Sequence, residues 1–284
     1  YSRETNPQLS ELQIISIPRV EACGTSTDVS LPCMMSRIGR SDYNRDRILS
    51  EEQLPSLLNR AGANVLWIDN QSGCKGACTG VSSRATTPNP QDCPNGECGD
   101  RVFLSELKGE LGKLPADRPT VLFLHMMGSH GPAYSLRSDK ARNLFEPECT
   151  DADLKSCSRE SVMNAYDNSV RETDYVLASL IRMLKDTSGS IDSALVYVSD
   201  HGESLGEGGL YLHGAPYWMA PKEQTEVPMV LWMNPGFEKT FSINRSKLEK
   251  NAAGRVTHEN LYHTVLGLLN VKSTTYVPTY DLTH

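Results

Sequence analysis

Four short apolar runs, each ending in a cluster of polar residues, constrain the fold more than any other feature of this chain. They are NVLWIDN, TVLFLHMMGSHG, SALVYVSDHG and VPMVLWMN, at residues 64–70, 120–131, 193–202 and 227–234. Their apolar residues are continuous, whereas a strand with one solvated face alternates apolar and polar residues. The runs therefore predict strands that are buried on both faces.

Three other segments have helical patterns. Residues 51–62 begin with acidic residues and end at a glycine, and residues 257–271 are amphipathic with Thr257 as the expected N-cap. Residues 158–186 place seven side chains along one face: Val162, Tyr166, Val170, Thr173, Leu177, Leu180 and Leu184. Because strands alternate with helices, residues 1–284 predict a single α/β domain whose central, mostly parallel sheet has helices on both faces.

Polar side chains lie where the predicted strands end. They are Asp69, Asn70, His125, His130, Asp200 and His201. Open parallel sheets bind ligands outside the carboxyl ends of their strands. We therefore expect the functional site at this edge, and we expect the glycine-rich turn after residue 203 to bring His213 back to it.

Asp200 and His201 are adjacent at one strand end and can reach a single cation. Zn²⁺ accepts such a mixed set of nitrogen and oxygen ligands. An isolated Asp-His pair is also compatible with a solvated turn. Four further side chains near the strand ends favour a metal site over that alternative: His125, His130, Glu203 and His213.

Residues 23–33, CGTSTDVSLPC, form a Ser/Thr-rich stretch between two cysteines. The simplest interpretation is a hydroxyl side chain that caps a short helix. The same position also suits a nucleophile, because the amide groups at a helix N-terminus stabilise an anion and a metal can deprotonate the hydroxyl. Both interpretations remain open on the residues alone.

The eight cysteines fall in four close pairs: Cys23 and Cys33, Cys74 and Cys78, Cys93 and Cys98, Cys149 and Cys157. Two of the spacings are compatible with a zinc knuckle, but the other two are too wide. An even number of cysteines in loop-like segments favours disulfides instead. Disulfides indicate an oxidising compartment such as a periplasm.

The overall charge excludes one large class of partners. With a net charge of −7 and no Lys/Arg run, the surface is not suited to nucleic acid.

No apolar stretch is long enough to span a membrane, and the first residues lack a signal-peptide pattern. An exported protein needs an export signal, so we expect further residues upstream of Tyr1.

Six motifs, in order along nearly the whole chain, resemble one enzyme family. They are ACGTSTDVSLPCM, NVLWIDNQSGCKGAC, MGSHGPAY, NAYDNSV, YVSDHGESLGEGGLYLHGAPY and APKEQTEVPM. Together they are similar to the catalytic domain of the lipid A phosphoethanolamine transferases, which include the mobile colistin-resistance enzymes. The SDHGE motif alone indicates only the wider alkaline phosphatase and sulfatase superfamily. The resemblance implies a sulfatase-like fold.

The resemblance also implies roles for individual residues. Thr27 matches the nucleophile that takes up phosphoethanolamine, and its oxygen belongs to the coordination shell of a zinc ion that Asp200 and His201 also bind. Glu203 matches an acidic residue of the family's substrate site, and His130 and His213 match histidines that bind the substrate phosphate or a second zinc ion. Lys75 matches a lysine of the substrate pocket, and Gln71 stands where the family has Asn.

One part of the family pattern is missing from residues 1–284. The family's fourth zinc ligand is a glutamate in a GETxR motif at the end of its first strand. Glu4 in SRETN resembles that motif, but no strand is predicted before it, so we do not assign it as a ligand. We expect the catalytic domain to be incomplete at its N-terminus, lacking this strand, the glutamate and a membrane region.

The implied reaction moves phosphoethanolamine from phosphatidylethanolamine to Thr27 and then to a phosphate of lipid A. The implied location is the periplasmic face of the inner membrane of a Gram-negative bacterium, with the protein a monomer. Two alternatives stay open. One is a phosphatase or sulfatase of the same superfamily that uses water as the acceptor, and the other is a truncated, inactive fragment that still binds ligand.

Overall fold

The computed structural model describes residues 3–88, 93 and 98–284. Its strands are β1 (Ile15–Glu21), β2 (Asn64–Asp69), β3 (Ser82–Ala85), β4 (Thr120–His125), β5 (Ala194–Val198), β6 (Ser204–Leu205), β7 (Tyr211–Leu212), β8 (Glu226–Met233) and β9 (Val256–Thr257). Its α-helices are α1 (Pro7–Ser10), α2 (Thr27–Met34), α3 (Arg45–Ser50), α4 (Leu54–Arg60), α5 (Val102–Leu111), α6 (Arg159–Asp186), α7 (Lys222–Thr225), α8 (Pro235–Thr240), α9 (Arg245–Ala252) and α10 (Glu259–Leu268). None of these described helices is long and apolar enough to cross a membrane.

The larger strands form two sheets, and the four predicted strands are confirmed as β2, β4, β5 and β8. One sheet has the order β3-β2-β4 and is parallel throughout. The other has the order β5-β8-β1-β9, and β8 runs antiparallel to both of its neighbours. β8 is therefore the exception to the predicted mostly parallel arrangement of the larger strands. The chain between β5 and β8 contains no crossover helix and stays at one end of the sheet, so β8 must return in the opposite direction.

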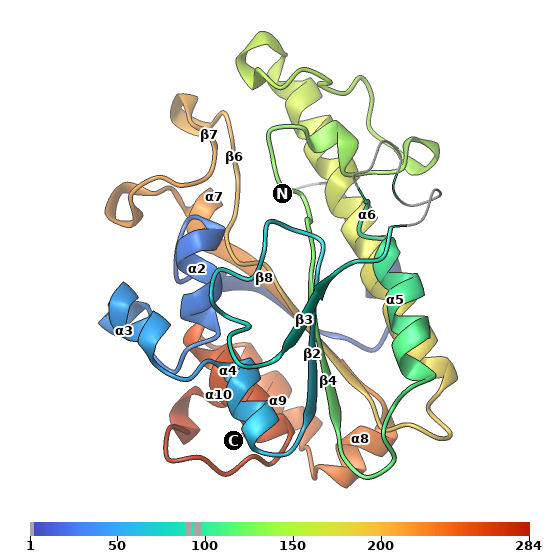
Figure 1. Ribbon diagram of the computed structural model, residues 1–284. Helices are drawn as coiled ribbons and strands as arrows, with labels where there is room; N and C mark the ends of the chain where they lie inside the picture. The colour runs from blue at the N-terminus through green and yellow to red at the C-terminus, as the bar shows by residue number, and fades with distance from the viewer. Residues whose placement is uncertain (1–2, 89–92, 94–97) are drawn as a thin grey trace.

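Helices cover both faces of the sheets, as predicted (Figure 1). On one face α2, α4, α9 and α10 pack through the largest apolar cluster, and on the other α5 and α6 pack through a second one. The helix predicted at 158–186 is α6, whose N-cap is Ser158. The N-cap prediction for Thr257 is one residue off, because His258 is the N-cap of α10, although the Thr257 hydroxyl accepts a hydrogen bond from the Glu259 amide at 3.2 Å.

A large cavity separates the two sheets. It lies between β4 and β5 and has a volume of about 1920 Å³. In the described part of the chain β4 pairs only with β2, and β5 pairs only with β8. All residues of both strands are half-buried, whereas continuous apolar runs predicted full burial on both faces. Both runs are strands, as predicted, but one edge of each has no neighbouring strand among the described residues.

A buried carboxylate ties the end of β4 to the end of β2. Asp100 accepts hydrogen bonds from the Met127 and Gly128 amides at 2.9 and 2.7 Å, and from the Asn70 side chain at 2.9 Å. Burial raises the pKa of Asp100, and these three donors oppose that effect. Asp100 therefore fixes the direction in which the chain leaves β4 toward His130.

Replacing Asp100 by alanine should lower the free energy of unfolding by about 3 kcal/mol, because three buried donors would lose their acceptor. Urea denaturation measures this loss. The matched control is Asp153→Ala, which removes an exposed carboxylate that accepts one hydrogen bond from the Lys155 amide. We expect the control to cost about 1 kcal/mol or less. Equal losses in the two variants would contradict a structural role for Asp100.

Candidate functional site

Loops at the carboxyl ends of three strands build the site; the sequence predicted two of these strands, β4 and β5, but not β1. Thr27 is the first residue of α2, shortly after β1. His130 follows β4, and Asp200 and His201 follow β5. The β6–β7 hairpin then returns the chain so that His213 also reaches the site. The side chains of Thr27 and His201 are buried.

Thr27, His201 and Asp200 converge. The Thr27 hydroxyl lies 3.3 Å from Nε2 of His201, and the same nitrogen lies 3.7 Å from Oδ2 of Asp200. This carboxylate oxygen is buried and has no hydrogen-bond partner. A buried charged oxygen without a partner is costly, and a bound cation would satisfy it. The donor set of one imidazole, one carboxylate and one hydroxyl therefore fits a divalent metal such as zinc.

Three histidines surround this point and share one hydrogen-bonding arrangement. His130, His201 and His213 each place a ring nitrogen within 4.8 Å of the others. In each ring Nδ1 faces an oxygen: Gly131 O at 2.7 Å for His130, Gly202 O at 3.0 Å for His201 and Glu203 Oε1 at 3.0 Å for His213. Because Nδ1–H donates to these oxygens, the Nε2 lone pair of each neutral ring is free to bind a cation or accept a proton.

The surroundings change the pKa values of two of these histidines in opposite directions. Burial lowers the pKa of His130, which keeps its ring neutral and its lone pair available. The hydrogen bond to Glu203 raises the pKa of His213, although burial opposes this shift. The two rings lie 4.8 Å apart, centroid to centroid. His213 is therefore the better of the two for carrying positive charge next to an anion.

Glu203 holds the histidine loops together. Its buried carboxylate accepts hydrogen bonds from His213, from the Gly131 amide at 3.2 Å and from the Tyr134 hydroxyl at 3.1 Å. The resemblance predicted a residue near the substrate. The structure gives the carboxylate three protein partners, so Glu203 acts on the site by orienting His213 and the chain next to His130.

Two contacts behind the site had no signal in the sequence. Gln224 is buried, accepts a hydrogen bond from the Ala215 amide at 3.1 Å and donates to Ser204 Oγ at 2.9 Å. At Gly202 an added Cβ would lie only 2.1 Å from the Glu223 carbonyl oxygen. The glycine of SDHGE is therefore required by close packing against the chain before β8.

His258 is a third residue that sequence reasoning missed. It is buried, accepts a hydrogen bond from the Cys23 amide at 3.0 Å, and donates from Nε2 to Ser199 O at 3.0 Å. Burial lowers its pKa to about 4, so the ring is neutral at physiological pH. His258 thereby joins the chain entering Thr27 to the chain entering Asp200.

Three predicted residues, Lys75, Gln71 and His125, lie outside the group of side chains that converge on Thr27. Lys75 donates to Ser72 O and Oγ, both at 2.8 Å, within its own turn. Gln71 lines the large cavity that also borders His130 and Asp200. His125 was expected to support a metal site, but it pairs with Asp69 at 2.9 Å and is outside the histidine cluster.

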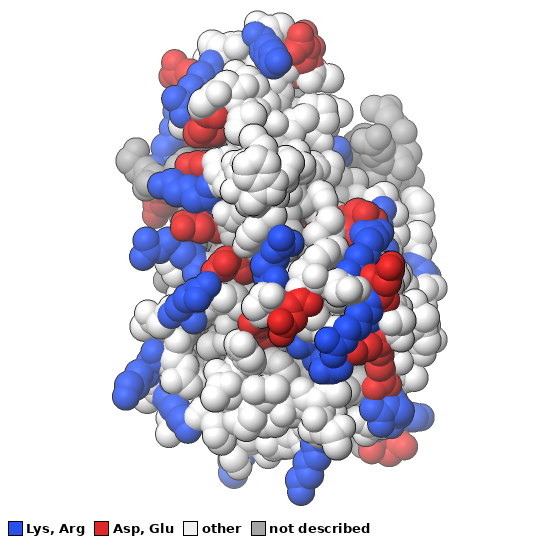
Figure 2. Space-filling model, turned by 90° about the vertical axis from the view of Figure 1, so that its left-hand side faces the viewer, with Lys and Arg blue, Asp and Glu red and all other residues white. Residues whose placement is uncertain are grey.

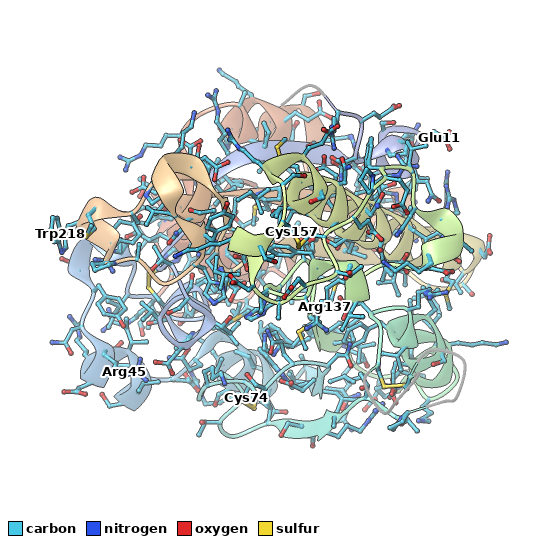
Figure 3. The ribbon with its side chains drawn as sticks, turned by 90° about the horizontal axis from the view of Figure 1, so that it is seen from above. Glu11, Arg45, Cys74, Arg137, Cys157 and Trp218 are labelled. Atoms are coloured by element: carbon cyan, nitrogen blue, oxygen red, sulfur yellow. A yellow bond between two sulfur atoms is a disulfide. The ribbon has the colours of Figure 1, made fainter. Side chains whose placement is uncertain are left out.

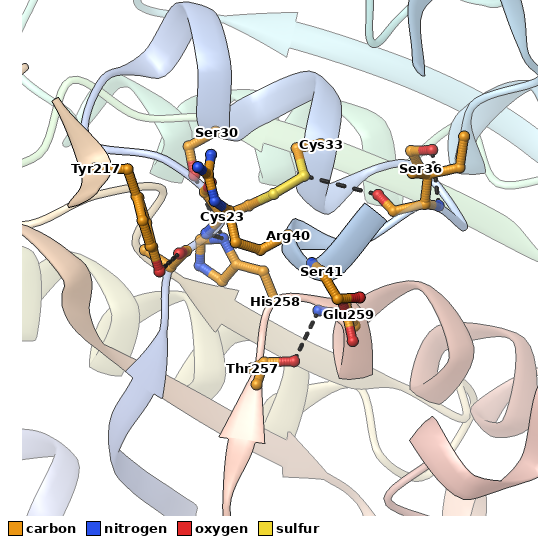
Figure 4. The surroundings of a disulfide bond; sticks show 12 residues. Cys23, Ser30, Cys33, Ser36, Arg40, Ser41, Tyr217, Thr257, His258 and Glu259 are labelled. Carbon is orange, nitrogen blue, oxygen red and sulfur yellow. Dashed lines mark hydrogen bonds between the residues drawn. A yellow bond between two sulfur atoms is a disulfide. The ribbon is translucent and has the colours of Figure 1, made fainter. Parts of the chain in front are cut away.

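All four cysteine pairs form disulfides, which confirms the disulfide interpretation over the zinc knuckle. The bonds are Cys23–Cys33, Cys74–Cys78, Cys93–Cys98 and Cys149–Cys157. The first of them links the two ends of the stretch that contains Thr27. Figure 4 shows Arg40 between this disulfide and Tyr217; its guanidinium lies 4.0 Å from the centre of the Tyr217 ring and 3.3 Å from the Cys23 carbonyl oxygen.

Comparisons with known proteins agree on one family. The sulfatase family profile matches residues 1–271. Phosphoethanolamine transferase EptA of Escherichia coli strain K12 is 40% identical over 99% of this chain and 52% of its own length. Phosphatidylethanolamine transferase Mcr-1 of Escherichia coli is 39% identical over 95% of this chain and 50% of its own length. This chain thus spans about half the length of these curated relatives.

A solved structure matches over a larger share of its length. The soluble domain of lipooligosaccharide phosphoethanolamine transferase A from Neisseria meningitidis aligns with a TM-score of 0.94 and 40% identity, covering 100% of this chain and 86% of that one. The expected fold class is thereby confirmed. This chain belongs to the sulfatase family, and within it to the phosphoethanolamine transferases.

Proposed function

We propose that this chain is the catalytic domain of a zinc-dependent enzyme that transfers phosphoethanolamine from phosphatidylethanolamine to a phosphate of lipid A. One observation carries the proposal: the Thr27 hydroxyl meets His201 at 3.3 Å beside the unpaired oxygen of Asp200. The names of the relatives support the transferred group, and that of Mcr-1 supports the donor. The solved relative acts on a lipooligosaccharide, which supports the acceptor.

Thr27, Asp200 and His201 would hold the zinc ion, and His130 and His213 would bind either the donor phosphate or a second ion. Zinc supplies a Lewis acid that lowers the pKa of a coordinated hydroxyl and neutralises phosphoryl charge. The position of Thr27 at the N-terminus of α2 adds the partial positive charge of the helix end.

The chain's own residues account for the rest of the reaction. Thr27 Oγ1 gives up its proton and forms a bond to the phosphorus of the donor as the bond from phosphorus to the diacylglycerol oxygen breaks, and that oxygen takes up a proton. His213, with its raised pKa, faces the phosphoryl oxygens, whose charge is the main obstacle in phosphoryl transfer. An oxygen of the lipid A phosphate then bonds to the same phosphorus as the bond to Thr27 Oγ1 breaks, and Oγ1 regains its proton. The added amine reduces the attraction of lipid A for cationic polymyxins.

The proposed location is the periplasmic face of the inner membrane. Four disulfides support an oxidising compartment. The curated relatives are about twice as long as this chain, which leaves room in them for the membrane region that the resemblance implies. We propose that the catalytic domain acts there as a monomer.

The cavity between β4 and β5 bears on the expected strand upstream of residue 1. We propose that this strand occupies the cavity between β4 and β5, pairing with both. Both strands lead toward the site at their carboxyl ends, and apolar side chains of α6 and α10 line the cavity from opposite faces. Arg3 contacts Asn164 and Asp167 near the start of α6, so a preceding segment can reach the cavity. The resemblance puts the fourth zinc ligand at the end of this strand.

The nucleophile can be tested by mass spectrometry of the Thr27 peptide after incubation with zinc and phosphatidylethanolamine. We expect a phosphoethanolamine adduct on Thr27. In Thr27→Ala the amount of adduct on the same peptide should fall by at least about a thousandfold. Ser26→Ala is the matched control, because the Ser26 side chain forms no capping hydrogen bond. Headgroup release without an adduct would indicate a hydrolase, and neither product would indicate an inactive fragment.

Metal binding can be tested by calorimetric titration of chelator-treated protein with zinc. Asp200→Asn and His201→Ala should each weaken binding by about a hundredfold or more, because each removes a ligand. His125→Ala should bind as tightly as the parent, since His125 pairs with Asp69 outside the cluster. If His130→Ala and His213→Ala reduce the stoichiometry, a second ion is present. Equal affinity of the His201 and His125 variants would refute the ligand assignment.

The strand proposal can be tested by amide hydrogen exchange. A version of the chain that includes about 20 residues of its natural upstream sequence should exchange the β4 and β5 amides much more slowly than residues 1–284 alone, because pairing protects them. The amides of β3 and β9, which border other edges, serve as the control and should not change. Unchanged exchange in β4 and β5 would contradict the proposal.

A further inference from the structure

The segment between His213 and α7 presents exposed apolar side chains beside the site. Trp218 is 86% exposed and Met219 is 53% exposed; both lie in the 3₁₀ turn Tyr217–Met219. Leu210, in the loop of the β6–β7 hairpin, is 42% exposed. Single exposed apolar residues are common on soluble proteins, but Trp218 is the most exposed large apolar side chain among the described residues. In Figure 3 it projects from the edge of the molecule.

The turn that carries Trp218 is rigid. Pro216 and Pro221 flank it, and proline fixes the backbone on both sides. The Met219 amide also donates to the Pro216 carbonyl oxygen at 2.9 Å. The two apolar side chains are therefore held outward by the backbone and do not belong to a freely moving loop.

The same turn is attached to the loop of the proposed nucleophile. The Gly214 amide donates to Thr25 O at 2.7 Å, and Thr25 Oγ1 donates to Ala215 O at 2.7 Å. The Tyr217 hydroxyl donates to Ala22 O at 2.8 Å. Trp218 and Met219 thus keep a fixed position relative to Thr27, two residues beyond Thr25 in the chain.

We propose that Trp218 and Met219 form an anchor that inserts into the headgroup layer of a phospholipid surface and holds the site against it. This inference rests on the proposed function, in which Thr27 must reach a phosphate at such a surface. Tryptophan is well suited to this layer, because its ring is apolar and its N–H can bond to water or headgroups. Exposed Lys222, three residues after Met219, adds attraction for anionic lipids.

The surface around the anchor fits a shallow contact. Figure 2 faces the side of the β6–β7 hairpin and the Tyr217–Met219 turn, and it shows an uncharged area in the upper half with both Lys/Arg and Asp/Glu around it. Two large apolar side chains give weak, reversible binding. Such binding suits an enzyme that must release one lipid product and take up another lipid.

The chain contains its own probe for the test. It has three tryptophans, and the other two, Trp67 and Trp232, are only 2% and 3% exposed. On vesicles of phosphatidylethanolamine and phosphatidylglycerol at 3:1, we expect a blue shift of tryptophan emission and quenching by lipids brominated near the headgroup. Both effects should disappear in Trp218→Ala. The emission of the two buried tryptophans confirms in the same spectrum that the variant is folded.

Vesicle sedimentation gives the affinity. The double variant Trp218→Ala, Met219→Ala should partition about tenfold more weakly than the parent. The matched control is Leu136→Ala, Leu144→Ala, which removes two leucines that are 66% and 62% exposed elsewhere and should partition as the parent does. Equal loss in both double variants, or no blue shift in the parent, would overturn the proposal. So would a Trp218-dependent dimer in light scattering, because a second copy would then cover the patch.

A final measurement separates this proposal from the proposed function. With a water-soluble short-chain phosphatidylethanolamine, the anchor variant should form the Thr27 adduct as fast as the parent, whereas with vesicles it should be about tenfold slower at limiting lipid. If neither protein forms an adduct but the parent still binds vesicles through Trp218, the proposed function fails and the anchor stands. If both react equally with vesicles, the anchor fails and the function stands.

Discussion

The buried carboxylate of Glu203 is the interaction on which the geometry of the site depends. A carboxylate at 8% exposure is unfavourable unless several donors satisfy it. Its donors come from three places: the Gly131 amide, the Tyr134 hydroxyl and the His213 ring. The cost of burying this charge is offset only when the loop after β4, which supplies Gly131 and Tyr134, meets the segment that carries His213, so one side chain fixes the relative positions of the loops that follow β4 and β5.

The histidine cluster adds a second constraint, which is electrostatic. The rings of His201 and His213 lie 4.2 Å apart, and that of His130 lies 4.8 Å from His213. Protons on several of these rings would repel one another, whereas one cation can take the lone pair of His201 and also satisfy the unpaired oxygen of Asp200. The unfolded chain does not hold these groups together, so a cation bound here also stabilises the fold.

Most of the residues that converge at the candidate site could be predicted from the sequence. His130, Asp200 and His201 follow apolar runs, and the rule that ligands bind at the carboxyl ends of strands placed them together. Thr27 was assigned to the same site only by the family resemblance. His258 and Gln224 could not be found in this way, because the role of His258 depends on a backbone amide 235 residues away and that of Gln224 on the path of the loop between Ala215 and α7. The direction of β8 was also missed: an apolar run looks the same in either direction, and only the path of the preceding loop decides it.

The antiparallel return of β8 has a consequence for how such a site can diversify. Because no helix crosses the sheet between β5 and β8, residues 199–225 form one continuous excursion above the strand ends. That single segment contains two of the three clustered histidines, Glu203 and the exposed Trp218. Insertions or exchanges within it would leave strand register and both helical layers unchanged. The residues around the metal site and those that attach the protein to a surface can thus change together within this one segment, while the sheets and helices stay the same.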